Sequence, residues 1–234
     1  MRYVGGKTRQ ARDFAPALLA DTVRRGRYFE PFVGGGSMLG ALGPHFSQVR
    51  AGDTHPDLVA MWQEVLGGWD PPSEVGPELY AQMRHAPVSA LRGFVGFGCS
   101  FGGKWFGGYH KPDKRWPRNI AAVTRDNLLK ITAGLPGDTL VTLGDYSQFE
   151  PGRSDVVYAD PPYRGGQHFT GTEPFDHDRF WATMDRWWRR GADVYVSEFQ
   201  APPGWEPLVV SKQRYQLQGP SDRFQEDTLF RRLR

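Results

Sequence analysis

Short strand-like segments alternate with helical ones along most of this chain, and this rhythm constrains the fold more than any other feature. The expected strands are residues 27–32, 47–53, 138–145, 154–160, 192–198 and 226–233. The expected helices are residues 55–66, 118–135 and 177–191, and a glycine turn within residues 33–42 opens a further helix. The helical segments place apolar residues on one face, as at Leu58, Met61, Trp62 and Val65. Strands that alternate with helices predict an α/β domain with a mostly parallel sheet.

The rhythm stops at residue 67 and resumes at residue 118. Glycine, proline and aromatic residues dominate the interruption. With 234 residues in total, the chain suits one domain or one domain with an insertion. We therefore expect residues 1–66 and 118–234 to form one domain, and residues 67–117 to form an inserted subdomain.

Composition excludes several classes of protein. The chain is 39% hydrophobic and 24% charged, which excludes a wholly disordered protein. No apolar run is long enough for a membrane span, and residues 1–10 lack the apolar core of a signal peptide. Cys99 is the only cysteine, so a reducing, cytoplasmic location is expected. The six histidines have no metal-ligand spacing, so no metal is expected.

Glycines and acids gather where the expected strands end, which is where open α/β sheets bind their ligands. Gly34 to Gly36 form a turn after the first strand, and Asp53 ends the second. An acid about 20 residues beyond such a turn is typical of a carboxylate that binds a ribose. The pattern predicts a cofactor that contains adenosine.

The details of the glycine turn favour one of two cofactor classes. Gly34, Gly36 and Gly40 stand one residue too far apart for the G-x-G-x-x-G turn of a nicotinamide dinucleotide site. Glu30 precedes the turn, where its charge would repel a pyrophosphate. A carboxylate there suits a cation, such as the ammonium group of a methionine moiety. We therefore predict S-adenosyl-L-methionine.

The sequence A-D-P-P-Y marks the end of a further strand. Proline cannot continue a central strand, so the strand must stop at Asp160 and leave a carboxylate at its tip. Pro161 and Pro162 stiffen the turn, and the aromatic ring of Tyr163 follows.

Six short motifs in this order resemble the Dam-like, D12 class N6-adenine-specific DNA methyltransferases. They are Y-V-G-G-K at 3–7, E-P-F-V-G-G-G-S at 30–37, G-D-T-H-P-D-L at 52–58, G-D-Y at 144–146, D-P-P-Y at 160–163 and V-S-E-F at 196–199. The departures are small: Tyr3 replaces a common tryptophan, and Gly52 and His55 replace two asparagines.

The resemblance implies a Rossmann-like methyltransferase fold with a small inserted DNA-recognition subdomain. It implies methyl transfer from S-adenosyl-L-methionine to N6 of an adenine flipped out of double-stranded DNA. Asp160 and the Pro161 carbonyl would each accept an N6–H bond, Pro162 would fix the turn, and Tyr163 would stack on the base. The residues expected to bind the cofactor are Tyr3, Lys7, Glu30, Phe32, Gly34, Gly36, Asp53, Asp145 and Tyr146.

A basic, aromatic stretch at residues 101–119 is the candidate reader of DNA. Basic side chains neutralise phosphates, and arginine can read guanine edges. The candidate contacts are Lys104, Lys111, Lys114, Arg115 and Arg118. The glycine-rich residues 164–170, just after Tyr163, form a candidate loop over the flipped base.

Several alternatives stay open at this stage. The same D-P-P-Y motif can serve N4-cytosine methylation, and an RNA base methyltransferase comes next. A catalytically silent DNA-binding protein and a nicotinamide enzyme are alternatives from other classes. A role in restriction–modification is a further expectation, and the target sequence and oligomeric state are not set by these motifs.

Overall fold

The computed structural model describes residues 1, 3–111, 119–164, 175–215 and 223–233. Its strands are β1 Arg27–Glu30, β2 Gln48–Asp53, β3 Thr139–Leu143, β4 Val156–Ala159, β5 Asp193–Glu198, β6 Trp205–Tyr215 and β7 Arg223–Arg232. Its α-helices are α1 Ala11–Asp21, α2 Ser37–Leu42, α3 Pro56–Leu66, α4 Pro77–Arg84, α5 Ala90–Gly93, α6 Ile120–Ala133 and α7 His177–Arg189.

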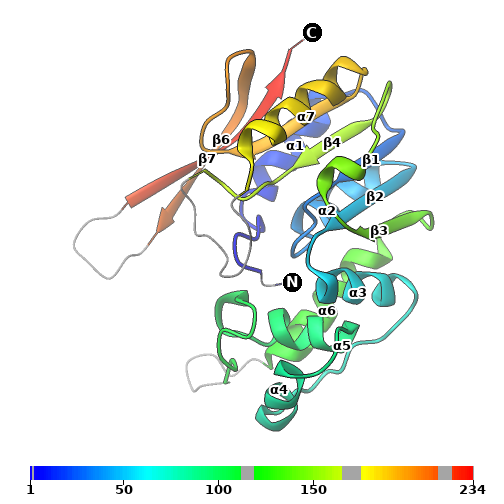
Figure 1. Ribbon diagram of the computed structural model, residues 1–234, viewed down its shortest axis with the longest axis vertical. Coiled ribbons are helices and arrows are strands. Elements are labelled where there is room, and N and C mark those ends of the chain that lie inside the picture. The colour runs from blue at the N-terminus through cyan, green and yellow to red at the C-terminus, as the bar shows by residue number, and fades with distance from the viewer. Residues whose placement is uncertain (2, 112–118, 165–174, 216–222, 234) are drawn as a thin grey trace.

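All seven of these strands form one sheet, in the order β3-β2-β1-β4-β5-β7-β6 (Figure 1). Strands β3, β2, β1, β4 and β5 are parallel to one another, whereas β7 runs antiparallel to both of its neighbours, β5 and β6. The prediction of an α/β domain with a mostly parallel sheet is therefore confirmed.

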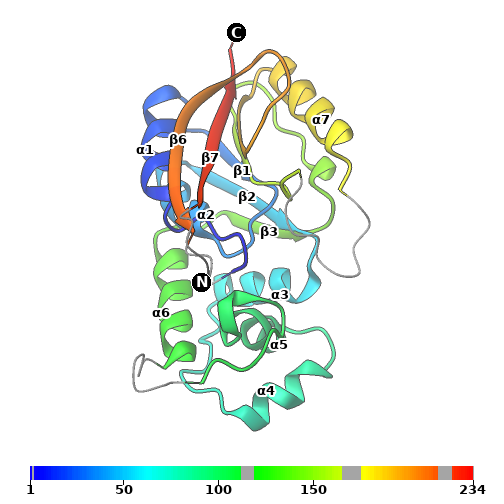
Figure 2. The same cartoon turned by 90° about the vertical axis from the view of Figure 1, so that its left-hand side faces the viewer.

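The two faces of the sheet are covered by different helices, with α1 on one side and α7 on the other (Figure 2). Neighbouring residues of a strand point to opposite faces, so Tyr28 packs in one core and Phe29 in the other. The α7 face buries Phe180, Met184 and Trp187 against the sheet. Central parallel strands need apolar residues on both faces, which explains why β4 is buried at every position.

Outside residues 67–117, two elements were not expected from the sequence. Helix α1 contains Pro16, a residue that usually ends a helix. Strand β6 contains Pro207, and the register with β7 shifts between Pro207 and Val209. Both elements pack together at the antiparallel end of the sheet, where tertiary contacts compensate for the weak local signals.

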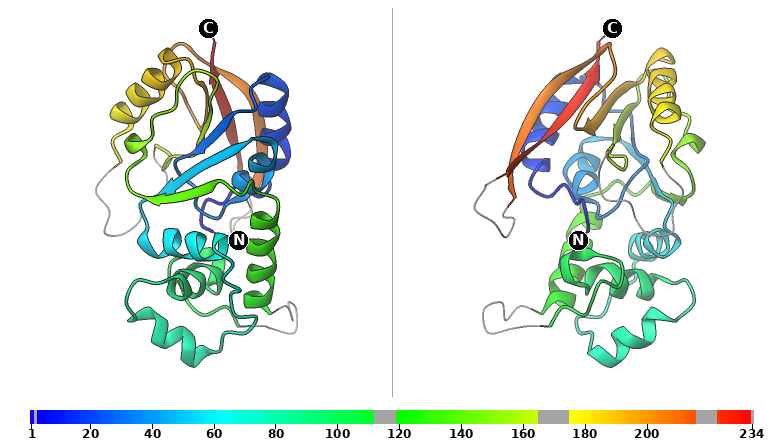
Figure 3. Two further views of the ribbon diagram at one scale, coloured as in Figure 1. Left: turned by 90° about the vertical axis from the view of Figure 1, so that its right-hand side faces the viewer. Right: turned by 60° about the vertical axis from the view of Figure 1, so that its left-hand side comes forward.

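Residues 67–103 and α6 form a helical region at one end of the sheet (Figure 3). The buried residues Phe94, Val95 and Phe97 of this region belong to the same core as Trp62 of α3 and Leu128 of α6. The region therefore shares its core with the α/β domain. The chain changes character at residue 67, but the packing continues across that point.

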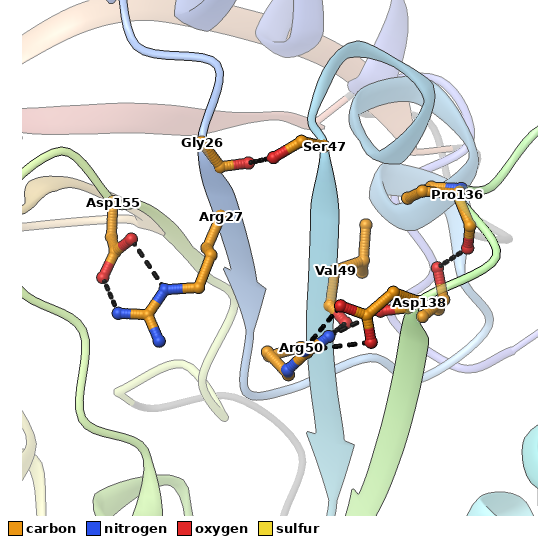
Figure 4. Close-up of polar contacts among 9 residues, drawn as sticks. Gly26, Arg27, Ser47, Val49, Arg50, Pro136, Asp138 and Asp155 are labelled. Carbon is orange, nitrogen blue, oxygen red and sulfur yellow. Dashed lines mark hydrogen bonds and ion pairs between the residues drawn. The ribbon is translucent and has the colours of Figure 1, made fainter.

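Ion pairs join neighbouring strands at their amino ends (Figure 4). Arg27 at the start of β1 donates from Nε and Nη2 to Asp155, over 3.0 and 2.6 Å. Arg50 of β2 donates from Nη2 to the Asp138 carboxylate before β3, over 3.0 and 3.1 Å. These pairs fix the strand starts at the edge opposite the carboxyl ends.

Candidate active site

A carboxylate stands at the carboxyl end of each of the five parallel strands. Glu30, Asp53 and Glu198 end β1, β2 and β5, while Asp145 and Asp160 follow β3 and β4 within two residues. Parallel strands bring these ends to one edge of the sheet. The chain order reverses between β1 and β4, so the ligand crevice is expected between Glu30 and Asp160.

The glycine turn after β1 is held by side chains of β2 and α3. The Gly34 N–H donates to Oδ2 of Asp53 over 3.1 Å, and Trp62 Nε1 donates to the Gly34 carbonyl over 3.0 Å. Oδ1 of Asp53 accepts from the His55 N–H. Gly36 has a φ of 71°, and a Cβ there would lie 2.5 Å from the Trp62 ring. Only glycine therefore fits position 36.

Glu30 is a buried carboxylic acid at the tip of β1. The Tyr28 hydroxyl donates to its Oε2 over 2.5 Å. Burial is the main reason that the pKa of Glu30 is raised to about 8; the bond from Tyr28 opposes the rise, and the charge of Asp160 adds to it. A buried acid of this kind favours a cationic ligand, because the cation would stabilise its charged form.

Tyr3 lies against the glycine turn. A Cβ on Gly34 would meet the Tyr3 ring at 3.0 Å, and a Cβ on Gly35 would meet the Tyr3 Cβ at 2.8 Å. The ring also packs against Phe97, with centroids 5.0 Å apart. Tyr3 therefore joins the turn to the helical region.

Asp160 accepts two donors on one of its oxygens. Ser197 Oγ donates to Oδ1 over 2.7 Å, and Lys7 Nζ lies 3.3 Å from the same atom. Among the residues that the structure describes, Oδ2 has no hydrogen-bond partner. Burial raises the pKa of Asp160, whereas Lys7 and Ser197 oppose that rise. One oxygen of the carboxylate is thus held, and the other is left to accept a further donor.

Lys7 belongs to the surroundings of Asp160 and Tyr163. Its ammonium nitrogen lies over the Tyr163 ring, 4.2 Å from the centroid, and 3.6 Å from Oδ2 of Asp227. The Tyr163 ring also meets Phe199 edge to face, at 4.6 Å. The structure therefore groups Lys7 with the D-P-P-Y motif.

Three more predicted cofactor residues form a cluster beside β3. The rings of Phe32 and Tyr146 stack with centroids 5.4 Å apart. Arg179 of α7 lies over the Tyr146 ring at 5.3 Å and donates to Asp145 Oδ1 over 2.7 Å. Burial would raise the pKa of Asp145, but hydrogen bonds from Ser147 and Arg179 lower it below its ordinary value. This carboxylate stays ionised beside an aromatic surface.

The predicted DNA contacts are only partly described. Lys104 and Lys111 are exposed on a short hairpin-like segment in which Ser100 bridges Tyr109 and the Phe101 N–H donates to the Gly108 carbonyl. The other three predicted contacts, Lys114, Arg115 and Arg118, lie outside the described residues, as does the predicted loop beyond Arg164.

Four side chains near the site were not predicted. Ser197 and Glu198 lie in the V-S-E-F motif, so their position after a strand could have identified them. Asp227 lies in the strand predicted at 226–233, and Gln10 precedes α1. No local sequence pattern connects Asp227 or Gln10 to the candidate site. Phe101 lies in the predicted DNA-reading stretch but was not named as a contact, and its side chain is 69% exposed.

None of the helices among the described residues is long and apolar enough to cross a membrane. No group of three or more His, Cys, Asp or Glu side chains in the described part could hold a metal ion.

Residues 3–77 match the family model of the D12 class N6 adenine-specific DNA methyltransferases. This match supports the predicted family. This D12 class segment contains the glycine turn, Glu30 and Asp53, but the D-P-P-Y motif lies beyond it. The match supports an S-adenosyl-L-methionine-dependent methyltransferase, and the predicted Rossmann-like fold is confirmed. No curated protein sequence matches the chain.

Solved structures resemble this chain at low identity. A protein described as a methyltransferase, yhhF from Escherichia coli, is 14% identical with a TM-score of 0.43, over 98% of this chain and 88% of that one. A protein described as an RNA methyltransferase from Pyrococcus horikoshii is 14% identical with a TM-score of 0.44, over 96% and 83%. An rRNA methylase from Streptococcus thermophilus is 10% identical with a TM-score of 0.40, over 96% of each. At these TM-scores the likenesses carry no argument about substrate.

The residues present fit S-adenosyl-L-methionine. Glu30 offers a buried acid for a cationic group. Asp53 lies at the turn with both oxygens fixed by backbone donors. Phe32 is half-buried and offers an aromatic ring of the kind that an adenine stacks on, with the buried Tyr146 stacked against it.

Proposed function

We propose that this protein transfers a methyl group from S-adenosyl-L-methionine to N6 of an adenine in DNA. The observation that carries the proposal is the state of Asp160: Oδ1 is held by Ser197 and Lys7, while Oδ2 has no hydrogen-bond partner among the described residues. The D12 class match supports the choice of adenine and DNA. The domain boundaries, with residues 67–117 as the target-recognition region, belong to this proposal.

The chemistry that the chain must supply is the activation of an amino group. The N6 lone pair of adenine is delocalised into the ring, so the nitrogen is a poor nucleophile. Asp160 Oδ2 accepts one N6–H bond and the Pro161 carbonyl accepts the other, which draws the nitrogen toward tetrahedral geometry. Asp160 would stabilise the positive charge that develops on N6 as the bond from nitrogen to methyl forms and the bond from sulfur to methyl breaks, and its Oδ2 would then accept the proton that N6 loses. The bound cofactor supplies the electrophilic methyl group as part of a sulfonium.

Tyr163 and the cofactor residues place the reacting groups. Tyr163 stacks on the flipped base, a contact worth about 1–3 kcal/mol. Glu30 and Asp53 hold the ammonium and ribose ends of the cofactor, with Tyr3 over the glycine turn. Base flipping is part of this proposal, because the Asp160 side chain is only 19% exposed and the N6 of an adenine inside a duplex has to leave the base stack to reach such a group. A cytoplasmic location and a role in restriction–modification stay predictions from the sequence.

The test is to incubate the protein with DNA and methyl-labelled cofactor, digest the DNA and identify the labelled nucleoside. N6-methyladenosine in its deoxy form is expected. Asp160→Ala should lose at least about 100-fold in kcat, as expected when a group that stabilises developing charge is removed. Asp178→Ala is the matched control, because that carboxylate is 96% exposed and pairs only with Arg164 in the described structure. Label on N4 of cytosine, or on RNA alone, would overturn the proposal.

A further inference from the structure

Lys7 lies between two carboxylates that come from distant parts of the chain. Its Nζ is 3.3 Å from Asp160 Oδ1 and 3.6 Å from Asp227 Oδ2. Both distances exceed the 2.7–2.9 Å of a tight charge-assisted hydrogen bond. The ammonium is therefore shared between the two acids, and it stays over the Tyr163 ring at 4.2 Å.

Asp227 reaches this position because β7 runs beside β5. Thr228 pairs with Glu198 at the end of β5, so Asp227 lies one residue beyond the paired segment, at the edge where the other carboxylates stand. Its side chain is 6% exposed. A buried carboxylate is costly without a partner, and Asp227 has two: Lys7, and Gln10, which donates from Nε2 to Oδ2.

Gln10 connects Asp227 to the backbone that carries Lys7. The Ala11 N–H donates to the Lys7 carbonyl over 2.7 Å, so residues 7 to 11 make the first turn before α1. One hydrogen bond of Asp227 fixes this turn through Gln10, and one ionic contact fixes the Lys7 side chain. Both constraints act on the same short segment.

We propose that Asp227, together with Gln10, is a positioning residue that holds Lys7 between Asp160 and the Tyr163 ring. Asp227 draws the ammonium away from full contact with Asp160, so that Oδ2 of Asp160 stays available to the amino group of the substrate. Without Asp227, Asp160 is the only carboxylate left to attract Lys7. The ammonium then competes with the substrate amino group for Asp160. The inference rests on the proposed function for its kinetic test only.

A purely structural role is the competing explanation. Ser211 pairs with Asp227 across β6 and β7, and its Oγ donates to Asp13 of α1 over 2.7 Å. On this explanation, the Gln10–Asp227 and Ser211–Asp13 hydrogen bonds only anchor α1 to the sheet. Ser211→Ala removes the neighbouring anchor without touching Lys7, so it measures what anchoring alone contributes.

The kinetic test is a double-mutant cycle on Lys7 and Asp227. Asp227→Asn should lower kcat about 10- to 100-fold, as misplaced catalytic groups do, while the dissociation constant of S-adenosyl-L-methionine changes less than about twofold. Asp227→Glu should recover part of the loss. In a Lys7→Met background, Asp227→Asn should cost nothing further, because Asp227 acts through Lys7. An equal loss in both backgrounds, or a similar kcat loss in Ser211→Ala, would overturn the proposal.

A second measurement is independent of activity. The Lys7 ammonium should give a protected 15N NMR signal, identified by its disappearance in Lys7→Met. Asp227→Asn should shift and broaden this signal. Glu226→Gln is the matched control, since this neighbour pairs with Lys212 over 3.2 Å and is 53% exposed. An unmoved signal in Asp227→Asn refutes the positioning role, whereas absence of DNA methylation by the wild type refutes only the proposed function.

Discussion

Glu30 is an acid whose charge depends on what binds beside it. Its folded pKa of about 8 lies above the ordinary 4.5, chiefly because of burial. Between pH 4.5 and about 8, the folded protein therefore keeps a proton on Glu30 that the unfolded chain has already released. The contribution of Glu30 to stability is full below about pH 4.5 and declines as the pH rises toward 8. The cofactor-free protein should thus lose stability over that range.

This acid also predicts a proton release when the cofactor binds. Between about pH 6 and 7.5, a cation beside Glu30 displaces its proton, so cofactor affinity should rise with pH by up to about tenfold per unit. Calorimetry in buffers of different ionisation enthalpy measures the proton count directly. Glu30→Gln should bind more weakly, with flat pH dependence and no release. A wild type that releases no proton would contradict the assignment of Glu30 to the ammonium.

Some site residues could be predicted from the sequence because they stand at strand ends that local turn residues mark. Asp160 is followed by two prolines, and Glu30 by a glycine turn, so local rules place both at strand tips. Asp227 has no such signal. Its neighbours on both sides continue the strand, and its function depends on β7 lying beside β5. Pairing between distant strands is a tertiary event that one sequence does not encode locally.

Among the elements, the amino ends of the strands offer a contrast between two similar ion pairs. Asp155 is 5% exposed and also accepts the Gly152 N–H over 2.8 Å, whereas Asp138 is 49% exposed. Asp155→Ala should lower stability by about 2 kcal/mol, because it removes hydrogen bonds to a buried charge. That corresponds to a fall in Tm of about 4–8 °C.

Asp138→Ala is the matched control on the next strand pair, with an expected loss below about 1 kcal/mol. Neither variant should change cofactor affinity, because both acids lie at the edge opposite the candidate site. Thermal unfolding followed by circular dichroism checks both values. Equal losses in the two variants would show that burial does not distinguish these pairs.

Elements with a regular apolar pattern were predicted within a few residues. Elements with a proline in their interior were not predicted. Strands β1 to β5 were predicted within a few residues, since each is a short apolar run bounded by turn residues. Helix α1 and strand β6 each contain a proline, which weakens the local signal. Their stability comes from packing on each other and on β7, as the Ser211–Asp13 hydrogen bond illustrates.

At the scale of the whole molecule, residues 101–111 present exposed basic and aromatic groups. If Lys104 and Lys111 each neutralise a phosphate, replacing both with alanine should weaken binding to every DNA sequence. The slope of log affinity against log salt should fall by about 2, since each contact contributes about 0.9. Phe101→Ala should instead lower affinity by about 1–3 kcal/mol through lost stacking, with an unchanged slope.

Lys130 on α6 is the control for this experiment, because it is exposed and about three turns from the start of its helix. Lys130→Ala should leave both affinity and slope unchanged. Binding titrations at several salt concentrations give both quantities. If the Lys104 and Lys111 variant keeps its slope, the DNA contacts lie elsewhere on the chain.

The hydrogen bond from Gln10 to Asp227 joins residues that are 217 positions apart in the sequence. Closing so large a loop is entropically unfavourable until the intervening chain has condensed. The parallel strands and their helices can therefore form before the two ends of the described chain meet. During synthesis, Lys7 leaves the ribosome long before β7 does. Its contact with Asp227 therefore forms only after β7 has been made. The last step of folding is then also the step that completes the surroundings of Asp160.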